Sequence, residues 1–210
     1  MSASMLFPKP NRSFMLAADR LCELAASADP SRIAECLDLL LSPSTLGRLQ
    51  QSARLQPRLA ELLLGNEVEV GSANWHEDPL LGYDPRRVAL LAGSIWHARS
   101  ILKLVSRHDL SILVEMIGAE AHAFAIRNLS SAVATNSIVD PEQLSRQIAY
   151  DGHACLGAWL EKASSLDRIR VILRLPVGTA ADNPTAEHRS AAGPLLSQVI
   201  DYLRTEAAKT

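Results

Sequence analysis

The sequence predicts an all-α fold, a compact bundle-like array of about eight to ten helices. Asp-Pro or Ser-Pro pairs at 29–30, 42–43, 84–85 and 140–141 each offer an N-cap acceptor followed by a proline at the first helical position. Runs rich in Leu, Ala and Ile follow each pair. Strand signals are scarce, and only residues 66–75, "NEVEVGSANW", have the character of a short extended piece.

The helical elements follow one another along the whole chain. We expect helices at 13–27, 30–41, 43–53, 57–64, 85–106, 109–117, 119–132, 141–163, 165–174 and 194–207. Residues 65–84 lack a sustained period and predict a long loop, and a second loop is expected at 177–188. We interpret the chain as a single helical domain, 1–210, in which residues 1–64 are a candidate N-terminal subdomain and residues 85–210 the main helical region.

Composition describes an ordinary globular chain. Its 210 residues are 48% hydrophobic and 21% charged, and 21 Lys and Arg against 23 Asp and Glu give a net charge of −2. This balance offers no overall field for nucleic acid or an anionic membrane. Cys22, Cys36 and Cys155 show no CxxC spacing, and their Leu- or Ala-rich neighbours predict buried thiols in a reducing compartment. Without a leader peptide pattern or a long apolar run, the expected location is the cytoplasm.

The expected helix at 85–106 has the clearest pattern. Apolar residues three and four apart form two stripes, which places this helix at the centre of the fold. His97 falls within the second stripe, so a core histidine with a hydrogen-bonded ring nitrogen is favoured over a ligand or an acid/base group. Trp96, Arg99 and Lys103 share a third side, which is either a contact patch or a solvated face.

Two glycines stand out in the expected helix at 141–163. Gly152 and Gly157 lower helix propensity and predict close approach of another helix. Residues 150–153, "YDGH", are alternatively a break between two shorter helices.

The sequence carries no motif for catalysis or for a bound cofactor. Nucleotide-binding glycine loops, metalloprotease and nucleophile-elbow patterns and paired CxxC are all absent from it. His76, Glu77 and Asp78 gather at one point, whereas Glu120 and His122 point to different sides of a helix. We therefore expect no enzyme activity, no cofactor and no metal.

Three arginines interrupt an apolar run at 164–178, "SSLDRIRVILRLPVG": Arg168, Arg170 and Arg174. The run fits either a strand or a helix capped by a serine, and the surrounding helices favour the helix. In both cases the arginines fall largely off the apolar face. They form either a polar surface or an interface in which guanidinium groups meet carboxylates.

Three long segments resemble the SctK/YscK family, accessory subunits of the cytoplasmic sorting platform of bacterial type III secretion systems. They are residues 93–126, 154–180 and 193–207, in the family's order and with similar gaps. The matching features are Trp96-His97, the stretch from Leu156 to Leu160, Arg174-Leu175-Pro176 and Pro194-Leu195. The resemblance covers about residues 80–207, while the first 75 residues are similar in helical character alone.

The resemblance implies a helical, non-enzymatic connector, cytoplasmic and peripheral to the inner membrane. Its partners would be the cytoplasmic forkhead-associated-like domain of the inner-membrane ring protein and the spoke protein of the platform, with no nucleic acid and no direct membrane insertion. A helical adaptor or chaperone unrelated to secretion is one alternative, and a small helical enzyme using His97 or His122 is another. Residues expected to contact partners, since Trp, Tyr and Arg dominate interfaces, are Trp75, Tyr83, Trp96, Arg99, Lys103, Arg168, Arg170 and Arg174.

Overall fold

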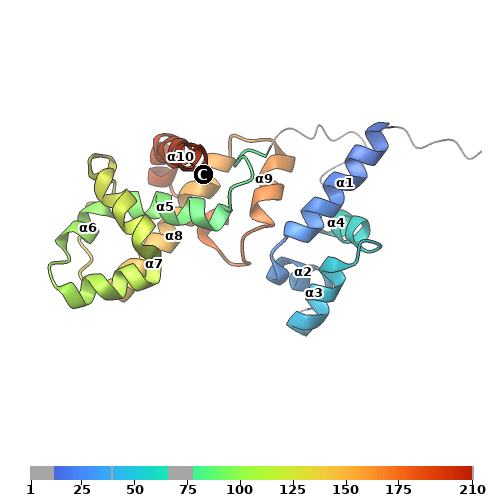
Figure 1. Ribbon diagram of the computed structural model, residues 1–210, viewed down its shortest axis with the longest axis horizontal. Coiled ribbons are helices and arrows are strands. Elements are labelled where there is room, and N and C mark those ends of the chain that lie inside the picture. The colour runs from blue at the N-terminus through green and yellow to red at the C-terminus, as the bar shows by residue number, and fades with distance from the viewer. Residues whose placement is uncertain (1–11, 39, 66–77, 210) are drawn as a thin grey trace, which may run out of the picture. The chain divides into compact units, whose positions relative to one another are not determined.

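The computed structural model describes residues 12–38, 40–65 and 78–209. Within these residues the chain forms ten α-helices and no strand, so the all-α prediction is confirmed (Figure 1). The contacts between residues divide the chain into two units, Met1–His76 and Glu77–Thr210.

The first unit is built from four helices: α1 (Arg12–Ser27), α2 (Pro30–Leu37), α3 (Pro43–Gln51) and α4 (Gln56–Leu64). The expected caps form, since the Asp29 side chain accepts from the Ser31 N–H and the Ser42 hydroxyl accepts from the Thr45 N–H. The Gln50 side-chain amide lies within hydrogen-bond distance of three carbonyls at the end of α1, those of Ala25, Ala26 and Ala28. It thereby covers carbonyls that the helix itself leaves unpaired.

The second unit holds the other six helices and two short 3₁₀ turns: α5 (Pro85–Trp96), α6 (Ala98–Lys103), α7 (Arg107–Arg127), η2 (Leu129–Ser131), α8 (Pro141–Leu160), α9 (Ser165–Ile172), η3 (Ala180–Asp182) and α10 (Ala186–Ala207). Helices α5 and α8 pack against each other, and α7 and α10 each pack on both of them (Figure 1). This arrangement matches the two apolar stripes of the expected central helix.

Glycines allow α5 and α8 to approach at backbone distance. A Cβ on Gly93 would lie 1.9 Å from the Ile148 carbonyl oxygen, and a Cβ on Gly152 would lie 2.1 Å from that of Ala89. Each glycine therefore lies against the backbone of the partner helix. The contacted residue in that helix, Ile148 or Ala89, lies one turn before the helix's own glycine. Further along α8, a Cβ on Gly157 would lie 1.9 Å from the carbonyl oxygen of Ala181 in η3. The close approach expected at Gly152 and Gly157 is confirmed.

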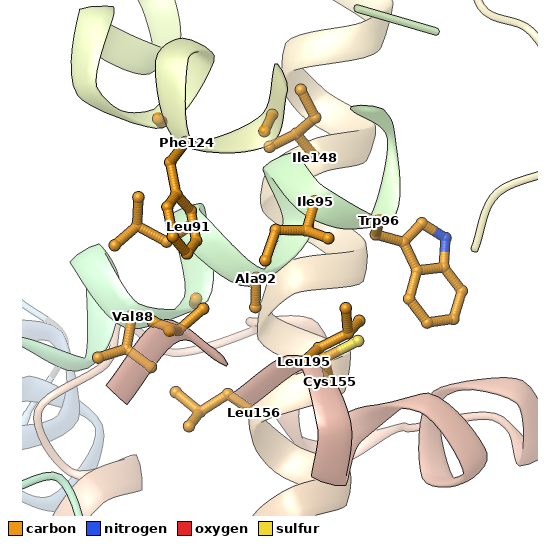
Figure 2. Close-up of a cluster of buried hydrophobic side chains, with 14 of the residues drawn as sticks. Val88, Leu91, Ala92, Ile95, Trp96, Phe124, Ile148, Cys155, Leu156 and Leu195 are labelled. Carbon is orange, nitrogen blue, oxygen red and sulfur yellow. The ribbon is translucent and has the colours of Figure 1, made fainter. Parts of the chain in front are cut away.

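The core of the second unit surrounds this contact. Figure 2 shows side chains of α5 gathered with those of α7, α8 and α10; the labelled residues are Val88, Leu91, Ala92, Ile95, Trp96, Phe124, Ile148, Cys155, Leu156 and Leu195. All of them are buried. The Trp96 indole points away from the centre of this cluster (Figure 2), toward the histidine network described below.

The expected single helix at 85–106 is wrong, because the helix breaks at His97. This residue has φ −99° and ψ 16°, outside helical geometry, and separates α5 from α6. The Trp96 carbonyl instead accepts from the Val133 and Ala134 N–H groups, at 3.2 and 3.0 Å. Those backbone bonds replace the helical one, so the Trp96 carbonyl stays paired at the break.

The expected start of the last helix at Pro194 is also wrong. Helix α10 begins at Ala186, behind a capping box in which Thr185 and His188 satisfy each other's backbone N–H groups. Pro194 lies inside the helix, where it removes the donor that the Ser190 carbonyl would receive in a regular helix. The second expected loop, 177–188, therefore ends earlier, before Ala186, and it contains η3.

Other boundaries are close to those expected. Gly118, at φ 84° and ψ 152°, interrupts α7 at the position where two separate helices were predicted. Helix α9 confirms the helical interpretation of the arginine run, and α8 is continuous through residues 150–153. In the expected loop at 65–84, residues 66–77 lie outside the described part of the chain.

We predict that Gly93→Ala lowers the free energy of unfolding of the second unit by about 3 kcal/mol or more, because the new methyl group would force α5 away from α8. Urea denaturation followed by circular dichroism measures this. Gly47→Ala in α3 is the matched control, since its added Cβ would meet no atom of the described chain within 4 Å. A Gly93→Ala protein as stable as the parent would contradict the backbone contact.

Candidate functional site

Arg174 holds the turn that leads into α5. Its guanidinium donates to the Asp78 carboxylate at 2.8 Å and to the Tyr83 carbonyl at 2.5 Å. The same carboxylate accepts from the backbone N–H groups of Leu80 and Gly82. Leu80 is fully buried. The turn is therefore held by the Arg174–Asp78 ion pair and by the packing of Leu80 in the core.

The other two arginines of the run differ from Arg174. Arg170 is partly buried and pairs with Asp167 one turn earlier, at 3.4 Å. Arg168 is partly buried and lies close enough to Glu161 to lower the pKa of that carboxyl, although Arg189 is its main partner. The run is thus one buried helix face plus three arginines with distinct surroundings.

A buried network of two histidines and one aspartate joins α5, α8 and α10. The Asp151 carboxylate lies 2.6 Å from His97 Nε2 and 3.0 Å from His188 Nε2. The Gln147 side-chain amide donates to the same carboxylate at 3.0 Å. Exposures of 3% for His97, 6% for Asp151 and 4% for His188 place all three in the interior.

Hydrogen bonding fixes the tautomer of His188. The Thr185 backbone N–H donates to His188 Nδ1 at 3.1 Å, and a backbone N–H can only donate. Nδ1 is therefore unprotonated, and the ring proton lies on Nε2, where it is donated to Asp151. His188 is a neutral histidine that caps α10 with one nitrogen and binds the carboxylate with the other.

His97 donates to Asp151 from Nε2, while its Nδ1 is buried and has no hydrogen-bond partner among the described residues. An imidazolium would place a charged N–H at Nδ1 with no acceptor, which costs more than an unpaired lone pair. The geometry therefore fits a neutral ring whose Nδ1 is an acceptor. The expected core histidine with a hydrogen-bonded ring nitrogen is confirmed.

The surroundings of Asp151 keep its carboxyl ionised. Burial is the largest influence and raises the pKa of this group, but hydrogen bonds from His97, Gln147 and His188 together outweigh it. The pKa of Asp151 consequently lies below its usual value.

A cavity of about 570 Å³ lies beside this network. Trp96, which stacks on the His188 ring with centroids 4.7 Å apart, forms part of its wall. The amide side chains of Gln143 and Gln147 and the half-exposed ring of Tyr150 also line it. A buried carboxylate, two imidazoles and several amides thus converge on one hollow, so its wall is more polar than that of most ligand pockets.

The structure separates the residues expected to bind partners. Trp96 is buried and Tyr83 is partly buried against the core. Arg99 and Lys103 are exposed on α6. Trp75 lies outside the described residues.

Hydrogen bonds connect Thr185, His188 and Asp151 as hydroxyl, imidazole and carboxylate, the same succession of groups as in the catalytic triad of a hydrolase. The Thr185 hydroxyl lies 2.8 Å from His188 Nδ1. The same hydroxyl is the N-cap of α10, and the Thr185 N–H, which an oxyanion site would need, is bonded to His188. This geometry favours a helix cap.

Cys155 is buried, as expected, whereas Cys22 is partly exposed and Cys36 is exposed, so the expectation of a buried thiol is wrong for Cys36. Burial, as the main influence, raises the pKa of the Cys155 thiol to about 12. Among residues 12–38, 40–65 and 78–209, no group of three His, Cys, Asp or Glu side chains is placed to hold a metal ion. His122 is partly exposed and makes no hydrogen bond or ion pair with the described part of the chain.

Sequence reasoning did not identify Asp151, His188 or the cavity. They come together through contacts across 37 and 54 positions, which no local spacing reveals. The one available signal was Thr185 three residues before His188, the spacing of a capping box with histidine in place of glutamate.

We predict that Arg174→Ala loosens the turn before α5. A hydrogen bond to a charged group contributes about 1.5–3 kcal/mol, so amide exchange at Gly82 and Tyr83 should accelerate by at least about tenfold. Hydrogen exchange with mass spectrometry or NMR measures this, with Arg168→Ala as the matched control. Equal protection in both variants would contradict the clamp.

We predict that Asp151→Asn destabilises the second unit by about 3 kcal/mol at pH 7, because it disrupts a buried, charged hydrogen-bond network. The folded-state pKa is lowered, so the stabilisation by the carboxylate is present above its unfolded value of about 3.9 and is lost as pH falls below it. The urea midpoints of parent and variant should therefore be measured at pH 7 and at pH 3. The difference between the two proteins should be larger at pH 7. The control is Asp201→Asn, an exposed group for which a change under about 0.5 kcal/mol is expected. A gap between parent and Asp151→Asn that is equal at both pH values would contradict the ionised carboxylate.

Comparison with known proteins identifies close relatives along nearly the whole chain. No family model matches the sequence, and no solved structure matches it. The nodulation protein NolU of Sinorhizobium fredii (strain NBRC 101917 / NGR234) is 56% identical over 199 residues, which span 95% of this chain and 94% of the relative. NolU of Rhizobium fredii matches with the same identity and coverage. The chain belongs to the NolU family of nodulation proteins.

Proposed function

We propose that the protein is a non-enzymatic connector in the cytoplasmic sorting platform of a bacterial type III secretion system. It would join the cytoplasmic domain of the inner-membrane ring protein to the spoke protein. The observation that carries the proposal is the resemblance to the SctK/YscK family over residues 80–207. The name of the NolU relatives adds support for a nodulation-related role.

The resemblance coincides with one structural unit. Residues 80–207 fall within Glu77–Thr210, the unit that contains α5 to α10. The matching residues are mostly buried, including His97, Leu156, Leu175 and Leu195. Core positions shared in this order favour a common fold over a chance likeness of separate helices. They do not specify a contact surface, which must lie elsewhere.

Helix α6 and the residues after it offer the best-supported contact surface. Leu102 is 56% exposed and Val105 is 92% exposed, beside the exposed Arg99 and Lys103. Exposed apolar side chains rimmed by polar residues are typical of a protein interaction site. We name Arg99, Leu102, Lys103 and Val105 the α6 surface.

Membrane attachment in this proposal comes through protein partners. Within the described parts of the chain, no helix combines the length and the apolar character needed to cross a bilayer. A peripheral position at the inner membrane would follow from binding to the ring protein.

We predict that the tagged protein, captured from cells of its own source, retains the ring protein and the spoke protein. The double variant Arg99→Ala, Lys103→Ala should retain at least one of them about tenfold less, the loss expected when about 1.4 kcal/mol of interface energy is removed. Immunoblotting against both partners measures this.

The control is Arg146→Ala together with Arg204→Ala, two exposed basic residues on other helices. Circular dichroism should show the same helicity in all the proteins. Capture of neither partner while the secretion apparatus is expressed would contradict the connector and favour an adaptor with other partners.

A further inference from the structure

The cavity beside Asp151 carries negative charge without a resident cation. Asp151 and Glu187 both line it, and no Lys or Arg is present among the described residues of its wall. Glu187 lies in the exposed first turn of α10, and its carboxylate makes no ion pair or hydrogen bond with the described part of the chain. With both histidines neutral, the two carboxylate charges are uncompensated in this hollow.

Acceptors without donors also mark the cavity. His97 lines it, is 3% exposed, and has an Nδ1 atom that no donor in residues 12–38, 40–65 or 78–209 reaches. An ionised carboxylate offers about four acceptor positions, and Asp151 receives three donors. A buried acceptor without a donor is rare in proteins, and here it belongs to a residue that lines the cavity. The missing chemistry is therefore a donor-rich cation.

We propose that this cavity binds the guanidinium group of an arginine presented by a protein partner, an inference that rests on the proposed connector function. Guanidinium supplies five N–H donors, has no acceptor and carries a permanent charge. Its flat face also packs well on aromatic rings, and Tyr150 and Trp96 belong to the wall.

The surroundings favour an arginine of a protein over a free cation. Val139, which follows the lining residue Ile138, is 69% exposed, and Tyr150 is half exposed. Exposed apolar and aromatic groups around a charged pocket form the kind of surface that a polypeptide covers, with the arginine as its central anchor. A small cation would leave these groups in water.

The first test is NMR titration of the ¹⁵N-labelled full chain with the capped peptide acetyl-Gly-Arg-Gly-amide. We expect saturable shifts of the Trp96 indole and of the Gln143 and Gln147 side-chain amides, at a Kd of about 1 mM, as befits one anchor without the rest of its interface. Glu187→Gln should weaken this binding by at least about threefold. Glu142→Gln is the matched control, because Glu142 also lies in the exposed first turn of a helix but outside the cavity.

Two other probes decide the chemistry. The same peptide with citrulline in place of arginine keeps the shape without the charge, and we expect it to cause no saturable shift. Saturation by citrulline at the same concentration, or no saturation by the arginine peptide, would overturn the proposal. Tighter binding of spermidine than of the arginine peptide would overturn the choice of a protein partner.

Partner capture separates this inference from the proposed function. Gln143→Lys places a resident ammonium group in the cavity wall, and we expect it to reduce capture of one platform partner by about tenfold. Equal capture by the parent and by this variant would overturn the inference and leave the connector intact. Failure of the parent itself to capture any platform partner would overturn the connector, and the peptide titration would then decide alone whether the cavity binds guanidinium.

Discussion

The backbone contact between α5 and α8 determines where the other parts of the second unit lie. Gly93 and Gly152 each leave room for a carbonyl of the opposite helix, so the two helices cross with no side chain between them. His97 follows Gly93 by about one turn, and Asp151 immediately precedes Gly152. The short distance between the helices therefore also brings the His97 ring within 2.6 Å of the Asp151 carboxylate. The close approach of α5 and α8 thus underlies both the packing of the core and the buried polar network.

Local signals in the sequence predicted the helices but not the polar network. Proline after a capping aspartate or serine marked the starts of α2, α3, α5 and α8, and Gly118 marked the break in α7. These features act within one helical turn, and so they are visible in a single sequence. The break at His97 depends instead on Val133 and Ala134, which supply donors from a distant loop. No local pattern around 97 carries that information.

Arg174 and Trp96 show why residue type alone is a weak guide to a contact surface. Both were expected to meet a partner, yet Arg174 binds Asp78 and the Tyr83 carbonyl within its own unit, while Trp96 is buried against His188. Arginine and tryptophan dominate interfaces because they combine area with hydrogen bonding, and the same properties stabilise a domain from within. Exposed Arg99 and Lys103 remain available on the α6 surface.

Burying the ionised carboxylate of Asp151 costs free energy, because the charge loses its contact with water. Apolar residues in place of buried charged groups often give equal or greater stability. Trp96 and the Thr185 cap hold His188 in place, and Gln147 supplies a further donor. These contacts hold the negatively charged carboxylate of Asp151 in a fixed position at the wall of the cavity. In the guanidinium site that we propose, acceptors held in place in this way would lose little entropy on binding, so the same rigidity would serve both the fold and the recognition of a partner.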